Sequence, residues 1–400
     1  MDSIRNQFPI LNTSVNNKPL IYLDNAASTQ KPLAVIDSIS DYYKSYNSNI
    51  HRGAHYLANI ATEKYENVRD LMASFIGAQS KEVIFTSGTT QSINLLMNAW
   101  GRKFLTKHDN IVLSEMEHHA NLVPWLALQQ EIGFGINYLP MGPDCALDLT
   151  NLDSIINDKT KLVSIAYISN AIGTIHPISQ IIGNAKSKSA LVHLDCAQAI
   201  QHFPINVEKL DIDFLSFSSH KLYGPMGIGV FWGRDKLLQE MNPYLYGGEM
   251  IKEVYLDKVT FNELPYKFEA GTPNVADVIG LGAAVQFILD LGFEYVQKQE
   301  NALHRFLLAE IEKIDRIKIY TPKENSTAVV SFNVEGAHPY DIGQLLDAKS
   351  IAIRTGHHCC QPLMRKLGIE GTCRASLAFY NSEEELSNFI SALKSIVKLV

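Results

Sequence analysis

The sequence predicts an α/β protein in which a mostly parallel sheet lies between helices and a smaller α+β unit follows it. Three observations support this prediction. Between residues 82 and 233, seven short runs rich in β-branched and aromatic residues alternate with segments of helical periodicity. The runs are apolar throughout, as is typical of strands whose sheet is covered on both faces. The length of 400 residues also favours two domains over one.

The predicted large sheet has seven strands, taken in chain order: EVIFT (82–86), NIVLS (110–114), INYLP (136–140), KLVSIAYIS (161–169), ALVHLD (190–195), IDFLSFS (212–218) and GIGVFWG (227–233). A helix is expected after the first strand, where Ile93, Leu96, Met97 and Trp100 recur at helical spacing. Another helix is expected from about Asn121, since proline is tolerated in a first turn.

The pattern changes after about residue 270. Two long helices are expected there, followed by the strand-like runs IKIY, AVVSFNV, IAIRT and CRASLAF. A helix is predicted near 340–349 and another from Ser382 to the end. We therefore expect a large domain at 21–270, a small C-terminal domain at 271–400 and an N-terminal segment, 1–20, that packs with the small domain.

The composition excludes several classes of protein. A net charge of −7 argues against a nucleic-acid binder, because neutralising phosphates favours a basic face. No apolar stretch approaches the ~20 residues that span a membrane, and the first residues lack a signal-peptide pattern. Five cysteines, two of them adjacent, do not form a disulfide framework. These features predict a cytoplasmic protein.

Lys221 stands in the run FSSHKLYGPMGIG (217–229), where a strand ends in a turn rich in glycine and proline. A lysine that forms a Schiff base with pyridoxal phosphate needs a constrained turn, phosphate-binding groups and a carboxylate for the pyridine nitrogen. Ser218 and His220 suit the phosphate, and Asp195 at the end of ALVHLD suits the nitrogen. The alternatives are a surface lysine and an aspartate that caps a helix. Gln198 is expected at the start of that helix, facing the phenolate oxygen of the ring.

Two further motifs follow predicted strands. The turn SGTT (87–90) leads into a helix, whose N-terminus together with Thr89 and Thr90 suits an anion such as phosphate. In EHHAN (117–121), a histidine can stack on a pyridine ring and move protons. Alone, SGTT is a weak signal because such turns routinely cap helices, and an isolated histidine pair is more often part of a surface loop or of a metal site. Their common position after strands is where open α/β sheets bind ligands.

The segment IAIRTGHHCCQPL (351–363) places two cysteines beside His357, His358 and Arg354, which suits a reactive thiol. A zinc site is the competing interpretation, but four consecutive ligands do not match the usual spacing. A pair of buried structural cysteines is the third interpretation of this segment. Arg374, in TCRASLAFYN, suits a bidentate clamp on a substrate carboxylate, although a strand arginine facing solvent is the simpler interpretation.

Together these motifs resemble fold type I pyridoxal-phosphate enzymes, within them the class V aminotransferase superfamily, and among those the SufS-type (group II) cysteine desulfurases. The resemblance runs nearly from end to end. Its motifs are YLDNAASTQKP (22–32), NIHRGAHYL, FTSGTTQSINL, EMEHHANLVPW, ISNAIGT, HLDCAQA, SSHKLYGPMGIG, FEAGTPNV, RTGHHCCQPLM and TCRASLAFYN.

The resemblance implies a role for each candidate residue. Those implied to be catalytic are Cys359, Lys221 and His118. Those implied to hold the cofactor are Lys221, Asp195 at the pyridine nitrogen, Gln198, His118 stacked on the ring, Thr89, Thr90, Ser218, His220 and, across a dimer interface, Thr272. Those implied to bind substrate are Arg374, Arg354 and Asn170, and no metal site is expected.

The implied reaction converts L-cysteine to L-alanine with a persulfide on Cys359. As in the family, the persulfide would pass from a homodimer to an acceptor protein of the SufE or SufU type and supply iron–sulfur cluster assembly. The alternatives are a selenocysteine lyase, an aminotransferase or kynureninase-like enzyme on the same scaffold, and a non-catalytic thiol or metal-binding protein. Three residues depart from the family pattern: Cys196 and Tyr246, where glycine is usual, and Cys360, where a small residue is common.

Overall fold

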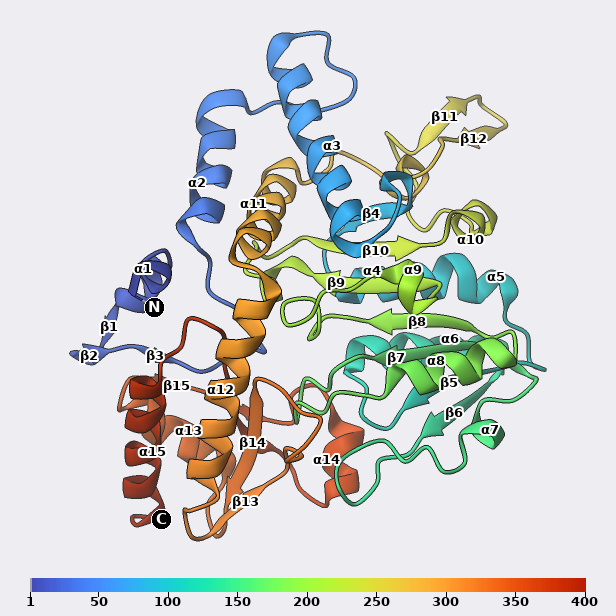
Figure 1. Cartoon of the computed structure of the whole chain (residues 1–400). Coiled ribbons are helices and arrows are strands. Elements are labelled where there is room, and N and C mark those ends of the chain that lie inside the picture. Colours follow the sequence, from blue (N-terminus) through green and yellow to red (C-terminus); the bar gives the residue numbers. More distant parts are fainter. Residues whose placement is uncertain (1) are drawn as a thin grey trace.

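The computed structural model describes residues 2–400, with side chains from Ile4 onward, and its centre is a seven-stranded sheet (Figure 1). The strand order is β4-β10-β9-β8-β7-β5-β6. Strand β10 runs antiparallel to both of its neighbours, and the remaining pairs are parallel. The predicted seven strands are confirmed as β4 (Val83–Thr86), β5 (Asn110–Ser114), β6 (Gly135–Leu139), β7 (Thr160–Ala166), β8 (Leu191–Asp195), β9 (Phe214–Ser218) and β10 (Gly229–Gly233).

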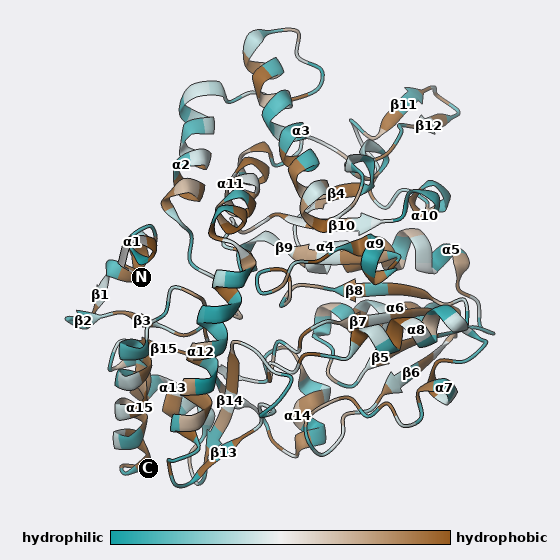
Figure 2. Cartoon of the chain, viewed as in Figure 1, coloured by the Kyte–Doolittle hydropathy of each residue, from teal (hydrophilic) through white to brown (hydrophobic). Residues whose placement is uncertain are grey.

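Helices cover both faces of this sheet, as the apolar strands predicted. One core joins alternate strand residues to α3 (Tyr56–Ile76), α8 (Ile178–Ser187) and α11 (Val275–Leu291). The opposite face packs against α4 (Thr89–Leu96) and α6 (Val123–Ile132). Hydrophobic colour runs along β8 in the middle of the sheet in Figure 2. Burial on both faces removes the apolar strands from water and is the main stabilising contribution.

A second sheet of four strands lies in the C-terminal part, in the order β13-β14-β17-β16. Its helices form a separate core with it. The predicted run IAIRT is divided, because β15 pairs in parallel with β3 near the N-terminus while β16 joins the four-stranded sheet. The bounds are β3 (Ile21–Tyr22), β13 (Ile317–Ile319), β14 (Val329–Val334), β15 (Ile351–Ala352), β16 (Arg354–Gly356), β17 (Thr372–Ser376), α12 (Phe293–Ile311), α13 (Pro339–Asp347) and α15 (Glu383–Val397).

The N-terminal segment packs on this C-terminal part. The Arg5 guanidinium lies 2.7 Å from the Glu385 carboxylate, and the Phe8 ring centroid lies 4.6 Å from that of Tyr380. The remaining helices and strands are short: α1 (Asp2–Arg5), β1 (Ser14–Val15), β2 (Lys18–Pro19), α2 (Leu33–Asp41), α5 (Arg102–Phe104), α7 (Leu152–Ile155), α9 (Val207–Leu210), α10 (Asp235–Glu240), β11 (Ile251–Val254), β12 (Val259–Phe261) and α14 (Gln361–Leu367).

Two local expectations differ from the structure. Residues 196–202 form a series of turns after β8, so Gln198 does not begin a helix, and the next helix is α9. The helix expected from Asn121 begins two residues later as α6, because a 3-10 turn, His119–Asn121, precedes it. In both places local polar contacts hold the backbone in turns after a strand end.

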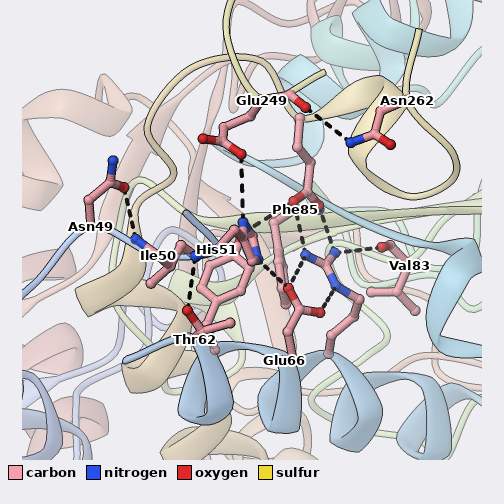
Figure 3. Close-up of polar contacts among 12 residues, drawn as sticks. Asn49, Ile50, His51, Thr62, Glu66, Val83, Phe85, Glu249 and Asn262 are labelled. Atoms are coloured by element: carbon pink, nitrogen blue, oxygen red, sulfur yellow. Dashed lines mark hydrogen bonds and ion pairs between the residues drawn. The ribbon is translucent and has the colours of Figure 1, made fainter. Parts of the chain in front are cut away.

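A charged cluster holds the segment around residue 269 against α3 (Figure 3). Arg69 on α3 is buried and donates to both carboxylate oxygens of Glu269, at 2.7 and 2.9 Å. Glu66, one turn earlier, accepts from Arg69 at 2.8 Å and contacts His51 Nε2 at 2.8 Å. Glu249 lies on the other side of the His51 ring, 3.9 Å from Nδ1.

No single helix within residues 2–400 has the length and apolar character needed to cross a membrane. Only α11 and α12 taken together reach that length and hydropathy, and they meet at a bend of 80°.

Candidate active site

The structure brings the candidate residues together around one cavity of about 450 Å³, beside the carboxyl ends of β7, β8 and β9. Arg354 and Cys359, from the C-terminal part, line it from the other side. Of the predicted site residues, Thr272 alone does not line this cavity. Those that do are Thr89, Thr90, His118, Asn170, Asp195, Gln198, Ser218, His220, Lys221, Arg354, Cys359 and Arg374.

Lys221 enters the cavity from the 3-10 turn Ser219–Lys221 that directly follows β9. Burial lowers the pKa of its ammonium to about 8, although the nearby Asp195 carboxylate acts in the opposite direction. Asp195 ends β8, and burial raises its pKa. Its Oδ1 accepts from the backbone N–H of Ala197 at 2.9 Å, a turn contact rather than a helix cap. A lysine and an aspartate are thus both buried at one end of the sheet.

The N-terminus of α4 forms a cradle for an anion. Gly88 has a φ of 144°, and a Cβ atom there would lie 3.2 Å from Ser218 Oγ. The Thr89 N–H and hydroxyl each lie 2.8 Å from the same oxygen. His220 faces the same cradle, and its Nδ1 is buried without a partner within the described part of the chain. Backbone N–H groups, hydroxyls and a helix N-terminus suit a phosphate.

His118 is buried at the cavity, and its protonation follows from its contacts. Nδ1 accepts from the backbone N–H of Ala120 at 3.0 Å, so the neutral ring carries its proton on Nε2. Burial lowers its pKa to about 3, and the positive charge of Lys221 adds to this effect. The ring is therefore neutral at physiological pH and presents one N–H.

The loop that carries the adjacent cysteines is held from several sides. His358 and Cys359 have φ values of 51° and 55°, an uncommon backbone conformation for residues with side chains. The His119 N–H donates to Cys359 O at 2.7 Å, and Asn170 Nδ2 donates to His358 O at 2.7 Å. Sequence reasoning did not identify His119 as this anchor, because the contact joins segments 240 residues apart (359 − 119).

The two cysteines differ in their surroundings. Cys359 is exposed at the cavity, whereas Cys360 is fully buried. The Cys360 thiol lies 3.1 Å from Asn170 Oδ1, and burial raises the pKa of this thiol strongly. Only a thiolate is a strong nucleophile, so the structure favours Cys359 as the reactive thiol.

Arg374 on β17 is buried next to the cavity with part of its donor capacity unused. Nη1 donates to Asn170 O at 2.7 Å and Nη2 to Asp24 Oδ1 at 3.4 Å. Nε has no partner within residues 2–400. Arg354, opposite Arg374 in the β16–β17 register, forms an ion pair with Asp24 at 2.9 Å. Asp24, which lies in the motif YLDNAASTQKP, is a contact that sequence reasoning missed.

The fold accommodates the side chains at the two positions where glycine is usual in the family, Cys196 and Tyr246. Cys196 is buried in the core, and its φ is not among the positive values, so its side chain fits the turn. Tyr246 is exposed, and its ring centroid lies 5.9 Å from that of Phe261.

The chain is similar to known proteins over nearly its whole length. The family model Aminotransferase class-V matches residues 21–389, nearly the whole chain. A cysteine desulfurase from Wigglesworthia glossinidia brevipalpis is 46% identical, over 99% of this chain and 97% of the relative. An apo cysteine desulfurase structure from Thermococcus onnurineus NA1 superposes with a TM-score of 0.95 at 38% identity, covering 100% of this chain and 98% of that one. The cysteine desulfurase CsdA from Escherichia coli gives 0.93 at 36%, with the same coverage.

The fold and site thus define a class V aminotransferase, a pyridoxal-phosphate protein of fold type I. At this level of identity over its full length, the chain belongs to the cysteine desulfurase family.

The residues present fit pyridoxal phosphate. Lys221 is buried at the cavity, the unpartnered His220 Nδ1 faces the anion cradle, and the Asp195 carboxylate is buried at the same cavity.

Proposed function

We propose that this chain is a cysteine desulfurase of the SufS type, which converts L-cysteine to L-alanine and leaves a persulfide on Cys359. The observation that carries this proposal is one cavity lined by a buried lysine and by an exposed thiol on a held loop. In the net reaction, the substrate C–S bond breaks, an S–S bond to Cys359 forms, and alanine gains the proton at Cβ. No external oxidant or reductant is needed to reach the persulfide.

Lys221 is the residue that removes and returns protons at the substrate carbon atoms. A pKa of about 8 makes the neutral amine accessible near physiological pH, as proton transfer requires. Pyridoxal phosphate supplies the electron sink that makes the α-proton acidic and the C–S bond labile. Asp195 favours a protonated pyridine nitrogen, because a buried carboxylate beside it stabilises that charge.

Thr89, Thr90, Ser218 and His220 would hold the phosphate, and Gln198 and Asn170 would face the ring. The Gln198 amide is oriented by its donation to Ala26 O at 2.7 Å, and Asn170 by its contact with His358 O. Neutral His118 would stack on the ring, and its Nε2–H would donate a proton to a sulfur-bearing group.

The Arg374 guanidinium binds the substrate carboxylate through its unpartnered Nε and through Nη2. A bidentate contact would replace the long contact to Asp24, which then remains paired with Arg354. The carboxylate fixes the substrate so that its sulfur points toward Cys359.

We further propose a homodimer. Large apolar side chains are exposed on and near the β11–β12 hairpin, and Leu256 at its tip is fully exposed. Hydrophobic surface of this kind marks an interface with a second copy. Thr272, which does not reach the cavity of its own chain, would then bind the phosphate of the partner.

The proposal has four further parts: the domain division 1–20, 21–270 and 271–400, a cytoplasmic location, a SufE- or SufU-type acceptor, and a role in iron–sulfur cluster assembly.

Selenocysteine lyase activity is the second candidate, because the same cavity accepts the selenium analogue and selenium is the better leaving group. Turnover of both substrates at equal concentration distinguishes the two activities through their kcat/KM ratio.

The test is turnover of L-cysteine by the holoenzyme in the presence of a thiol reductant. We expect equal amounts of alanine and sulfide from the wild type. Cys359→Ala should form neither while it retains the bound cofactor, which borohydride fixes on Lys221. Sulfide production by Cys359→Ala at the wild-type rate would overturn the choice of nucleophile.

A further inference from the structure

A row of buried polar residues crosses the sheet beneath the cavity, from β9 to the loop after β5. The row has one member on each of β9, β8 and β7 and two in the loop. Each of the five side chains is at most 2% exposed. The members are Ser216, His193, Ser164, Asn121 and Glu117. They lie in one continuous hydrogen-bonded chain.

The hydrogen bonds of this row have one direction. Asn121 Nδ2 donates to Glu117 Oε2 at 2.8 Å, so Asn121 Oδ1 is the acceptor from Ser164 Oγ at 2.6 Å. The Ser164 hydroxyl has then given its proton and accepts from His193 Nδ1 at 2.7 Å. Burial lowers the pKa of His193 to about 3, so the ring is neutral and Nε2 accepts from Ser216 Oγ at 2.9 Å.

Every donor in the row therefore points toward Glu117, and the Glu117 carboxylate accepts further hydrogen bonds from outside the row. Ser114 Oγ lies 2.6 Å from Oε1, and the backbone N–H of Ala166 lies 3.2 and 3.1 Å from the two oxygens. Among the described residues no cation pairs with this carboxylate. The N–H groups of Asn121 and Ala166 can only donate, so they hold the carboxyl oxygens as acceptors, and with the Ser114 hydroxyl also donating the arrangement favours the anion.

The position of Glu117 links two parts of the site. It directly precedes His118 in the chain and bonds to Ala166 at the end of β7. Ala166 is paired in register with Asp195 on β8. The carboxylate thus ties the His118 loop to the strand beside the aspartate that serves the cofactor. The titratable groups that act on it are Asp195 on β8 and Cys360 before α14, while His193 on β8 is linked to it through Ser164 and Asn121.

We propose that Glu117 is a positioning residue of the desulfurase site, which as an anion fixes the His118 ring over the cofactor and adds a second negative charge beside Asp195. This inference rests on the proposed function. Burial, with the charge of Asp195, raises the pKa of Glu117 to about 7, and the hydrogen bonds from Ser114, Asn121 and Ala166 act in the opposite direction and favour the charged form. Glu117 does not itself contact the substrate cavity.

The test is Glu117→Gln, which preserves shape but replaces one acceptor oxygen by a donor amide. The amide then opposes at least one of the three donor groups, and the His118 loop shifts. We expect kcat to fall roughly 10- to 100-fold, as for a small misplacement of a catalytic group, with the KM for L-cysteine changed less than twofold. The KM is preserved because Arg374 is untouched.

A spectroscopic readout separates this inference from the proposed reaction. Titration of the visible absorption of the bound cofactor needs no turnover. Glu117→Gln removes a buried negative charge and so disfavours the protonated form of the cofactor. The midpoint of the absorption titration should therefore move to lower pH by about one unit. Failure of desulfurase activity in the wild type would refute the proposed function but leave this titration interpretable.

Glu82→Gln is the matched control. Glu82 is likewise buried and acts only as an acceptor, from the N–H groups of Gln79, Asp235 and Trp232, but it lies before the edge strand β4 and is not part of the row or of the His118 loop. It should leave both kcat and the spectral midpoint unchanged. If Glu117→Gln fails to fold, Ser164→Ala is the second variant, because it interrupts the row while sparing the contacts of Glu117. The midpoint of the cofactor absorption in Ser164→Ala should move in the same direction by a smaller amount. A wild-type kcat and midpoint in Glu117→Gln, or in Ser164→Ala where that variant replaces it, would overturn the inference.

Discussion

The buried pair between Arg69 and Glu269 leads to a quantitative prediction for Glu269→Ala. Arg69 is 1% exposed, and two of its donors end on the Glu269 carboxylate. The same carboxylate accepts from the backbone N–H of Phe85 at 2.7 Å. The substitution therefore leaves a buried guanidinium and a strand N–H without these partners.

The expected loss in the free energy of unfolding depends on the contacts that Arg69 keeps after the substitution. Removing one partner of a buried ion pair costs about 3–5 kcal/mol, because the other charge stays buried and uncompensated. Glu66 keeps its 2.8 Å contact with Arg69, which favours the lower end, about 3 kcal/mol. Unfolding entropies of about 2.1 cal/mol/K per residue over this length convert that loss into a fall in Tm of about 4 °C.

Urea and thermal unfolding of the holoprotein at one fixed protein concentration measure this loss. The matched control is Glu131→Ala, which removes an exposed carboxylate that also receives two guanidinium contacts, from Arg102. Exposed pairs contribute little, so the control should unfold as the wild type does. If Glu269→Ala and Glu131→Ala unfold at the same urea concentration as the wild type, the reasoning from burial is wrong.

Two further predictions concern the thiols and the acid stability. Cys360→Ala should retain persulfide formation on Cys359 and at least half of the wild-type kcat, since burial holds the Cys360 thiol protonated; loss of the persulfide, detected by mass spectrometry, would contradict this. Burial alone would raise the pKa of Glu66, but His51 and Arg69 lower it to about 2, below the 4.5 of a free glutamate. The stability that Glu66 contributes should therefore be complete above about pH 4.5 and lost as the pH falls toward 2, so urea unfolding of Glu66→Gln should show a flatter decline over that range than the wild type.

Local sequence determined the sheet and most of the cavity. Strands such as NIVLS are apolar on both faces, and Lys221 and Asp195 each follow such a strand directly. Their convergence needed only the rule that parallel strands present the same ends. Only the fold could distinguish the adjacent cysteines, because Cys359 is exposed at the cavity and its neighbour Cys360 is fully buried.

Long-range contacts were outside the reach of sequence patterns. Asp24 and His119 lie in predicted motifs, but their partners are hundreds of residues away. The segment after Asp195 was expected to be helical, and turns formed instead because Cys196 N bonds to Ser216 O on the adjoining strand. The row that ends at Glu117 is likewise visible only once four strands are aligned.

The restrained backbone of Cys359 has a consequence for sulfur transfer. With its carbonyl fixed by His119 and the preceding carbonyl by Asn170, the loop has little freedom to swing as a unit. A sulfur atom carried on this residue moves chiefly by rotation about the side-chain bonds, which limits its travel to a few ångströms. Delivery then depends on the recipient, whose thiol has to come to the rim of the cavity.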